Sequence, residues 1–148
     1  MMSDPRSVEI LLVEDSPEDA EMTIRALRKY RLANRIHHVL NGEEALDFLF
    51  ATGAYRTRQP LDVPKVILLD LKLPGLDGLG VLKRIRSDAR TKMVPVVVMT
   101  SSRQDRDLLE SYRLGTNSYV VKPMEFDKFT EAVRQLGLYW LSANQVPA

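Results

Sequence analysis

Charged or hydroxyl residues follow four of the short apolar runs in this sequence. Glu14 and Asp15 follow the first run, Asp70 the third, Thr100 lies at the end of the fourth, and Lys122 follows the fifth. If these runs are neighbouring parallel strands, the side chains meet at one edge of a sheet, where ligands bind in such folds. Three carboxylates beside one ammonium group would form a small anionic pocket.

An anionic pocket of this kind needs a compensating charge. Two carboxylates repel each other by roughly 4 kcal/mol at about 4 Å and an effective dielectric constant of about 20. A divalent cation brings three acids and Lys122 to zero net charge, and Mg²⁺ suits carboxylate ligands beside phosphate. We therefore predict a Mg²⁺ site, with Mn²⁺ as a substitute.

Each residue taken singly also has an ordinary structural explanation. Glu14 and Asp15 would fit a solvated loop before a helix, and Asp70 would fit a turn ahead of Pro74 and Gly75. The prediction therefore depends on the combination, with each group at the end of a different run.

The apolar runs predict the strands that position this pocket. Several runs are continuous rather than alternating, which is typical of parallel strands buried on both faces. The five runs span residues 8–13, 35–40, 65–69, 94–99 and 118–121.

Five amphipathic patterns predict helices between and after these strands. The first begins at Ser16, which can cap it, with Pro17 at its first position. The fourth ends at Gly115, a residue suited to the position after a helix, and the fifth begins at about Glu125. The patterns are carried by Ala20, Ile24 and Leu27; Ala45, Leu46, Leu49 and Phe50; Gly78, Val81, Leu82 and Ile85; Leu108 and Tyr112; and Phe126, Phe129, Val133, Leu136 and Trp140.

This alternation predicts an α/β fold with a five-stranded parallel sheet. Right-handed crossovers favour a flavodoxin-like, doubly wound (βα)5 arrangement in strand order 2-1-3-4-5, with helices on both faces. A Rossmann nucleotide domain is the competing fold. A Rossmann domain normally has a G-x-G-x-x-G pattern after its first strand, but this sequence has Glu14 and Asp15 there. The sequence also has no P-loop pattern.

Length and composition limit the alternatives. The 148 residues predict one domain, and 21 Lys and Arg against 20 Asp and Glu leave no basic excess for nucleic-acid binding. The lack of cysteine excludes disulfides and fits a reducing compartment. The run over residues 8–13 is too short and acidic for a signal peptide or membrane span. We expect a cytoplasmic protein without a membrane partner.

Taken together, these motifs resemble the receiver domain of two-component response regulators, which has the CheY-like fold. The resemblance covers about residues 8–140. It implies a receiver over residues 8–141, tails over 1–7 and 142–148, and no output domain. It rests on Glu14-Asp15, on the D-x-x-[LM]-P-x-x-D-G pattern from Asp70 to Gly78, on Thr100, and on Tyr119 followed by Lys122-Pro123.

The resemblance implies a role for each matching acid. Asp70 would be the phosphoacceptor and would also contact Mg²⁺. Asp15 would be a direct metal ligand, and Glu14 would act through water. The backbone carbonyl of Lys72 would complete the protein ligands.

Further roles follow for the remaining matches. Thr100 would hydrogen-bond the phosphoryl group and Lys122 would pair with it. Tyr119 would be an aromatic switch that turns inward when Thr100 moves. The bond between Lys122 and Pro123 is expected to be cis.

The implied function is that of a single-domain response regulator. It would take a phosphoryl group from a sensor histidine kinase and act as a phosphoacceptor rather than an enzyme. The changed surface of the fourth helix, fifth strand and fifth helix would then contact a downstream protein or phosphotransfer domain. Two alternatives stay open: a pseudo-receiver that binds partners without phosphorylation, and a metal-dependent phosphohydrolase. The hydrolase would need a second acid where Lys72 stands.

Two positions bear on phosphoryl lifetime. Lys72 and Ser102 lie two residues beyond Asp70 and Thr100, and neither has a carboxylate or amide to orient a water. Slow-to-moderate dephosphorylation is therefore expected, although Lys72 also fits a plain surface lysine.

Residues 51–64 form a connection of 14 residues, where about 2–6 are usual. The A-T-G-x-Y pattern within it resembles stand-alone regulators that partner bacterial or cyanobacterial phytochrome kinases. The alternative is a variable surface loop without a dedicated role.

Apolar residues near the C-terminus lie off the stripe of the fifth helix. A second face of this helix carries Leu138, Tyr139 and Leu141. Such apolar side chains are expected to pack against another protein surface. A homodimer through the fifth helix and its extension is expected; a tail folded back on its own domain is the alternative.

Overall fold

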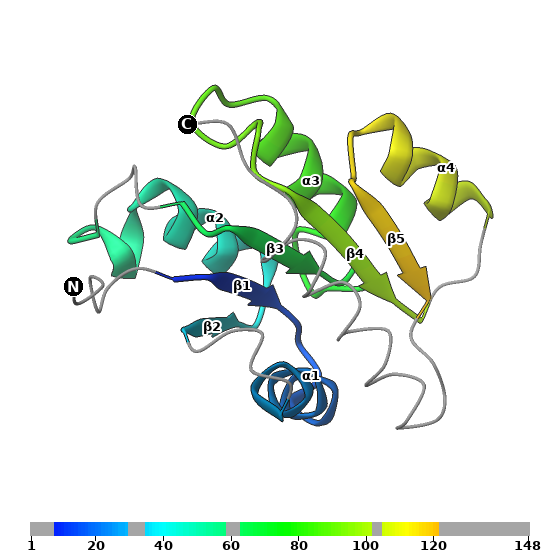
Figure 1. Cartoon of the computed structure of the whole chain (residues 1–148). Helices are drawn as coiled ribbons and strands as arrows, with labels where there is room; N and C mark the ends of the chain where they lie inside the picture. The colour runs from blue at the N-terminus through cyan, green and yellow to red at the C-terminus, as the bar shows by residue number, and fades with distance from the viewer. Residues whose placement is uncertain (1–7, 30–34, 59–62, 102–104, 122–148) are drawn as a thin grey trace.

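A parallel five-stranded sheet forms the centre of the molecule (Figure 1). The structure, a computed structural model, describes residues 8–29, 35–58, 63–101 and 105–121. The strand order is β2-β1-β3-β4-β5, so the predicted flavodoxin-like topology is confirmed. The strands are β1 (Ile10–Val13), β2 (Ile36–Val39), β3 (Val66–Leu69), β4 (Val96–Thr100) and β5 (Ser118–Val121).

Helices cover both faces of this sheet. Figure 1 shows α1 on one face and α2 and α3 on the other. α4 follows β4 along the chain and lies beside β5. The helices are α1 (Pro17–Lys29), α2 (Gly42–Phe50), α3 (Gly78–Arg86) and α4 (Asp105–Arg113), with a short 3-10 turn, η1 (Gly53–Tyr55).

Burial explains why the central strands read as continuous apolar runs. All residues of β1, β3 and β4 are buried. Successive side chains point to opposite faces of the sheet. Leu11 and Ile67 therefore join the core beneath α2 and α3, whereas Leu12 and Leu68 join the core beneath α1.

The helix patterns are confirmed for α3 and are wrong in one respect for α4. Gly78, Val81, Leu82 and Ile85 are all buried in α3. In α4, by contrast, Leu108 and Tyr112 are exposed, 36% and 52% respectively. The buried side of α4 carries polar residues instead, Asp107 and Ser111.

Gly115 has φ 95°, as expected for a residue that ends a helix in the left-handed conformation. The predicted fifth helix, the Lys122–Pro123 bond and the apolar residues at 138, 139 and 141 lie outside the described residues. Within the described part of the chain, no helix is long and apolar enough to cross a membrane.

Candidate functional site

Strand pairing brings two of the predicted acids to one edge of the sheet. Val13 and Leu69 are register partners on the adjacent strands β1 and β3. The next residues, Glu14 and Asp70, therefore leave the sheet side by side. The backbone N–H of Asp70 also donates to the Val13 carbonyl at 3.1 Å, which extends the pairing to the site itself.

Glu14, Asp15 and Asp70 form a cluster of carboxylates. One oxygen from each lies within 4.8 Å of the others. Glu14 and Asp70 are buried, 3% and 8% exposed, whereas Asp15 is exposed. Three oxygen donors that converge at this spacing, two of them out of bulk water, fit a hard cation such as Mg²⁺ or Mn²⁺. The donor set therefore agrees with the predicted metal site.

Local hydrogen bonds hold Glu14 in place. Its Oε2 accepts from the backbone N–H of Ser16 at 3.2 Å, and its own N–H donates to the Val39 carbonyl at 3.0 Å. The Glu14 carbonyl lies 2.7 Å from Nε2 of His38. Because a carbonyl can only accept, His38 donates from Nε2. This contact between β2 and the site was not predicted, since a histidine on an edge strand has no sequence signal.

The loop after β3 shapes the surroundings of Asp70. The backbone N–H of Lys72 donates to Oδ1 of Asp70 at 3.1 Å. Gly78 begins α3 against this loop, and its N–H donates to the Leu71 carbonyl at 3.0 Å. A Cβ at Gly78 would lie 2.3 Å from the Asp70 carbonyl oxygen. The glycine of the predicted motif therefore lets the chain pack closely against the acceptor.

The Lys72 side chain reaches a residue that sequence reasoning missed. Its Nζ lies 3.4 Å from Oδ2 of Asp107, on α4. The Asp107 side chain is 9% exposed and the Lys72 side chain 60%. An acid on a mostly charged helix resembles a solvated residue in sequence, so nothing marked Asp107.

Thr100 and Tyr119 lie on one face of the sheet. Thr100 is fully buried at the end of β4 and pairs in register with Val121, while Tyr119 pairs with Val98. Register partners point to the same face, as do residues two apart on a strand. Tyr119 is half-buried. The predicted switch residues therefore share a face, whereas Lys122 and Ser102 lie outside the described residues.

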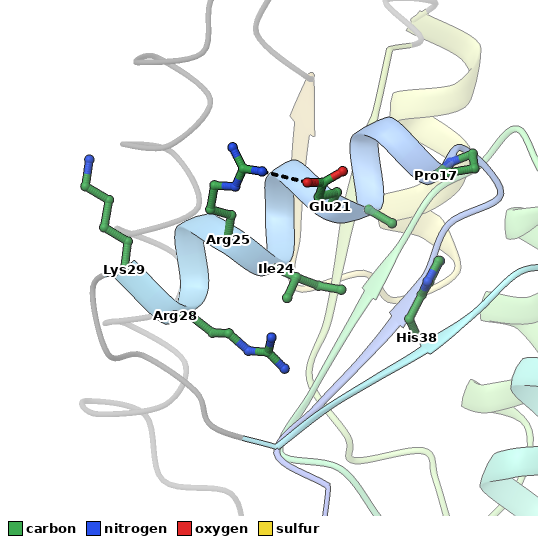
Figure 2. A pocket seen from close by; sticks show the side chains of 8 residues that line it. Pro17, Glu21, Ile24, Arg25, Arg28, Lys29 and His38 are labelled. Atoms are coloured by element: carbon green, nitrogen blue, oxygen red, sulfur yellow. Dashed lines mark hydrogen bonds and ion pairs between the residues drawn. The ribbon is translucent and has the colours of Figure 1, made fainter.

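A groove runs along α1 (Figure 2). It has a volume of about 820 Å³, with Ile24 on its apolar side and Arg25 paired with Glu21 at 2.6 Å. His38 of β2 lines one edge of this groove (Figure 2). Because the same histidine contacts the Glu14 carbonyl, this edge of the groove adjoins the acidic cluster. The lining residues are Pro17, Ala20, Glu21, Ile24, Arg25, Arg28, Lys29 and His38.

The first part of the long connection is attached to β2 and α2. The Tyr55 hydroxyl donates to Oε2 of Glu44 at 2.9 Å and lies 2.8 Å from Nε2 of His37. Burial and the hydrogen bond to Glu44 raise the pKa of Tyr55 to about 12. Burial is also the main cause that lowers the pKa of His37, with a smaller contribution from Arg58. This part of the connection is therefore ordered by specific side-chain contacts.

Comparisons with protein families, curated proteins and solved structures all find response regulators. The profile of the family described as response regulator receiver domain matches residues 10–134. The chain is 34% identical to response regulator Rcp1 of Synechocystis over 99% of this chain and 97% of that protein. The Mn²⁺-bound structure of Rcp1 superposes with a TM-score of 0.86, over 94% of this chain and 98% of that one.

Two further solved structures are similar. The phosphorylated cyanobacterial phytochrome response regulator RcpA has a TM-score of 0.87 and 34% identity, covering 94% of this chain and 97% of that one. The bacteriophytochrome response regulator AtBRR has a TM-score of 0.72 and 49% identity, covering 92% of this chain and 96% of that one. Similarity to phytochrome-associated regulators thus extends over nearly the whole chain.

Proposed function

The chain belongs to the response regulator receiver family, and from that premise we propose that it is a single-domain regulator that accepts a phosphoryl group on Asp70 from a sensor histidine kinase. The main observation in support of this proposal is the cluster of Glu14, Asp15 and Asp70. One carboxylate oxygen from each lies within 4.8 Å of the others. The proposal takes residues 8–141 as the receiver, acting in the cytoplasm.

The proposed reaction moves a phosphoryl group from nitrogen to oxygen. An oxygen of Asp70 forms a bond to phosphorus while the P–N bond of a phosphohistidine breaks, and its electron pair stays on the imidazole. The product is an acyl phosphate. Such transfers depend mainly on positioning and charge stabilisation. Here the Lys72 N–H orients the Asp70 carboxylate.

The remaining groups would stabilise charge on the phosphoryl oxygens. The proposal assigns a hydrogen bond to Thr100 and an ion pair to Lys122. Asp15, Asp70 and the Lys72 carbonyl would hold Mg²⁺, with Glu14 acting through water. The bound ion would supply positive charge beside the transferred group. The Mn²⁺-bound form of Rcp1 supports a divalent ion in this family.

The proposed output is a change on the surface of α4, β5 and the predicted fifth helix. A phosphoryl group gives Thr100 a new acceptor, and Tyr119 on the same face would fill the space that Thr100 leaves. Exposed apolar side chains on α4 support contact with a partner there. They are Leu108, Leu109 and Tyr112.

The proposed kinase partner belongs to the phytochrome class. Similarity to phytochrome response regulators supports this partner. The groove on α1 offers it a surface, and one lining residue of that groove, His38, contacts the Glu14 carbonyl. The cations of that groove, Arg25, Arg28 and Lys29, favour an acidic patch on the kinase.

Phosphorylation by acetyl phosphate with Mg²⁺ tests the function. We expect intact-mass measurement to show one phosphoryl adduct on the wild type and none on Asp70→Asn. Asp77→Asn is the matched control, since Asp77 lies in the same loop and asparagine can also cap α3. Asp77→Asn should be labelled normally.

Other outcomes would contradict the proposal in distinct ways. An adduct that persists in Asp70→Asn would place the acceptor elsewhere. A wild type without any adduct would indicate a pseudo-receiver. Continuous release of phosphate with fast turnover would indicate a phosphohydrolase.

A further inference from the structure

Lys72 connects the acceptor to α4 through two different groups. Its backbone N–H donates to Oδ1 of Asp70 at 3.1 Å, and its Nζ lies 3.4 Å from Oδ2 of Asp107. The contact joins the loop after β3 to a helix that follows β4. An ion pair therefore lies between the loop that carries Asp70 and the helix whose surface is proposed to change.

The helix α4 buries polar side chains and exposes apolar ones. Its buried side carries Asp107 and Ser111. Among the described residues, Ser111 Oγ has no hydrogen-bond partner, and such burial is unfavourable. Its outward side carries Leu108, Leu109 and Tyr112, which are 36%, 69% and 52% exposed. The Lys72–Asp107 ion pair adds a specific contact between this helix and the loop that carries Asp70.

A phosphoryl group on Asp70 would compete for the same ammonium. It carries nearly two negative charges and three acceptor oxygens, against the single charge of Asp107. The Lys72 ammonium lies on a flexible stem, and its side chain is 60% exposed. Movement of Nζ away from Asp107 would therefore meet little packing resistance.

We propose that the Lys72–Asp107 ion pair is a latch that holds α4 in place until phosphorylation of Asp70 draws Lys72 away. This inference rests on the proposed function. It adds a connection from the acceptor to α4 that does not pass through Thr100 and Tyr119. Because coupling between two equilibria is reciprocal, opening the latch also favours the phosphorylated state.

Binding of the phosphoryl analogue BeF₃⁻ in the presence of Mg²⁺ tests the latch. The substitution Asp107→Asn removes the charge that pairs with the Lys72 ammonium. We therefore expect this variant to bind BeF₃⁻ about three- to fivefold more tightly than the wild type. Lys72→Met also removes the ion pair, but it should bind BeF₃⁻ more weakly than the wild type, because it lacks the ammonium that would pair with the phosphoryl oxygens. In the Lys72→Met background, adding Asp107→Asn should change the affinity no further, because the ammonium that transmits the effect is gone.

Glu110→Gln is the matched control for charge. It removes one acid from α4, but Glu110 pairs with Arg113 at 3.6 Å rather than with Lys72. We expect its BeF₃⁻ affinity to equal that of the wild type. An affinity gain in Glu110→Gln as large as in Asp107→Asn, or a gain that survives in the Lys72→Met background, would overturn the latch.

Amide hydrogen exchange over residues 105–113 gives a second readout that requires only the wild type and Lys72→Met. Exchange in α4 should accelerate when BeF₃⁻ binds the wild type, and Lys72→Met should exchange rapidly without it. Unchanged exchange in both overturns the latch even if Asp107→Asn does not fold. If the wild type forms a phosphoryl adduct but shows none of these differences in amide exchange, only the latch is overturned. If the wild type forms no adduct, the proposed function and the latch are both overturned.

Discussion

At Gly78 the chain has no room for a side chain. A Cβ would lie 2.3 Å from the Asp70 carbonyl oxygen and 2.5 Å from the Leu71 Cα, and both are backbone atoms that cannot rotate away. Gly78→Ala should therefore displace the acceptor loop, destabilise the protein by about 1–3 kcal/mol and slow labelling by acetyl phosphate. Urea unfolding and intact-mass labelling measure the two effects.

Gly80→Ala is the control for this substitution. Its Cβ would meet Cδ1 of Leu76 at 2.6 Å, which is the end of a flexible side chain, and alanine favours a helix over glycine. It should keep normal labelling. Equal losses of labelling in Gly78→Ala and Gly80→Ala would show that the close approach to Asp70 is unimportant.

At the scale of the element, α1 combines a buried face with a cationic groove. Its buried residues are Ala20, Thr23, Ala26 and Leu27, while Arg28 is exposed and lines the groove. Arg28→Glu should slow phosphorylation by the kinase about tenfold, because opposing charge lowers the rate of encounter. Phosphorylation by acetyl phosphate should be unchanged, since it needs no docking.

Lys83→Glu provides the same charge reversal on α3, where Lys83 is exposed. Its rate with the kinase should stay near that of the wild type. If Lys83→Glu slows kinase transfer as much as Arg28→Glu, net charge explains the effect and the groove does not.

For the whole molecule, His37 links folding to pH. Burial and the nearby charges of Arg58 and His38 lower its pKa in the folded protein, against the opposing effect of Glu44. The unfolded chain therefore binds a proton more readily. Stability from this group is complete above about pH 6.5 and is lost as the pH falls toward the folded-state pKa.

Comparison with His37→Gln isolates this contribution. The urea midpoint of the wild type should fall more steeply than that of His37→Gln as the pH decreases from 8 to 5. Parallel midpoints across this range would contradict the link.

The homodimer through the fifth helix stays a prediction, because its residues lie outside the described part of the chain.

The strands and helices were predictable to different degrees. Continuous apolar runs predicted β1, β3 and β4 because a central parallel strand buries every residue, which leaves little ambiguity. The apolar pattern of α4 was misleading, since Leu108 and Tyr112 face outward and Asp107 faces inward. Which side a helix buries depends on its neighbours in space, and those neighbours are distant in the sequence.

The sequence by itself determined the order of elements, the family resemblance and the acids that follow β1 and β3. These features depend on local periodicity and on residue types at strand ends. Only the tertiary structure decided that Lys72 pairs with Asp107, that His38 contacts the Glu14 carbonyl, and that a side chain at Gly78 would strike the acceptor loop. Each of these contacts joins separate elements whose relative placement is set by packing of the sheet and its helices.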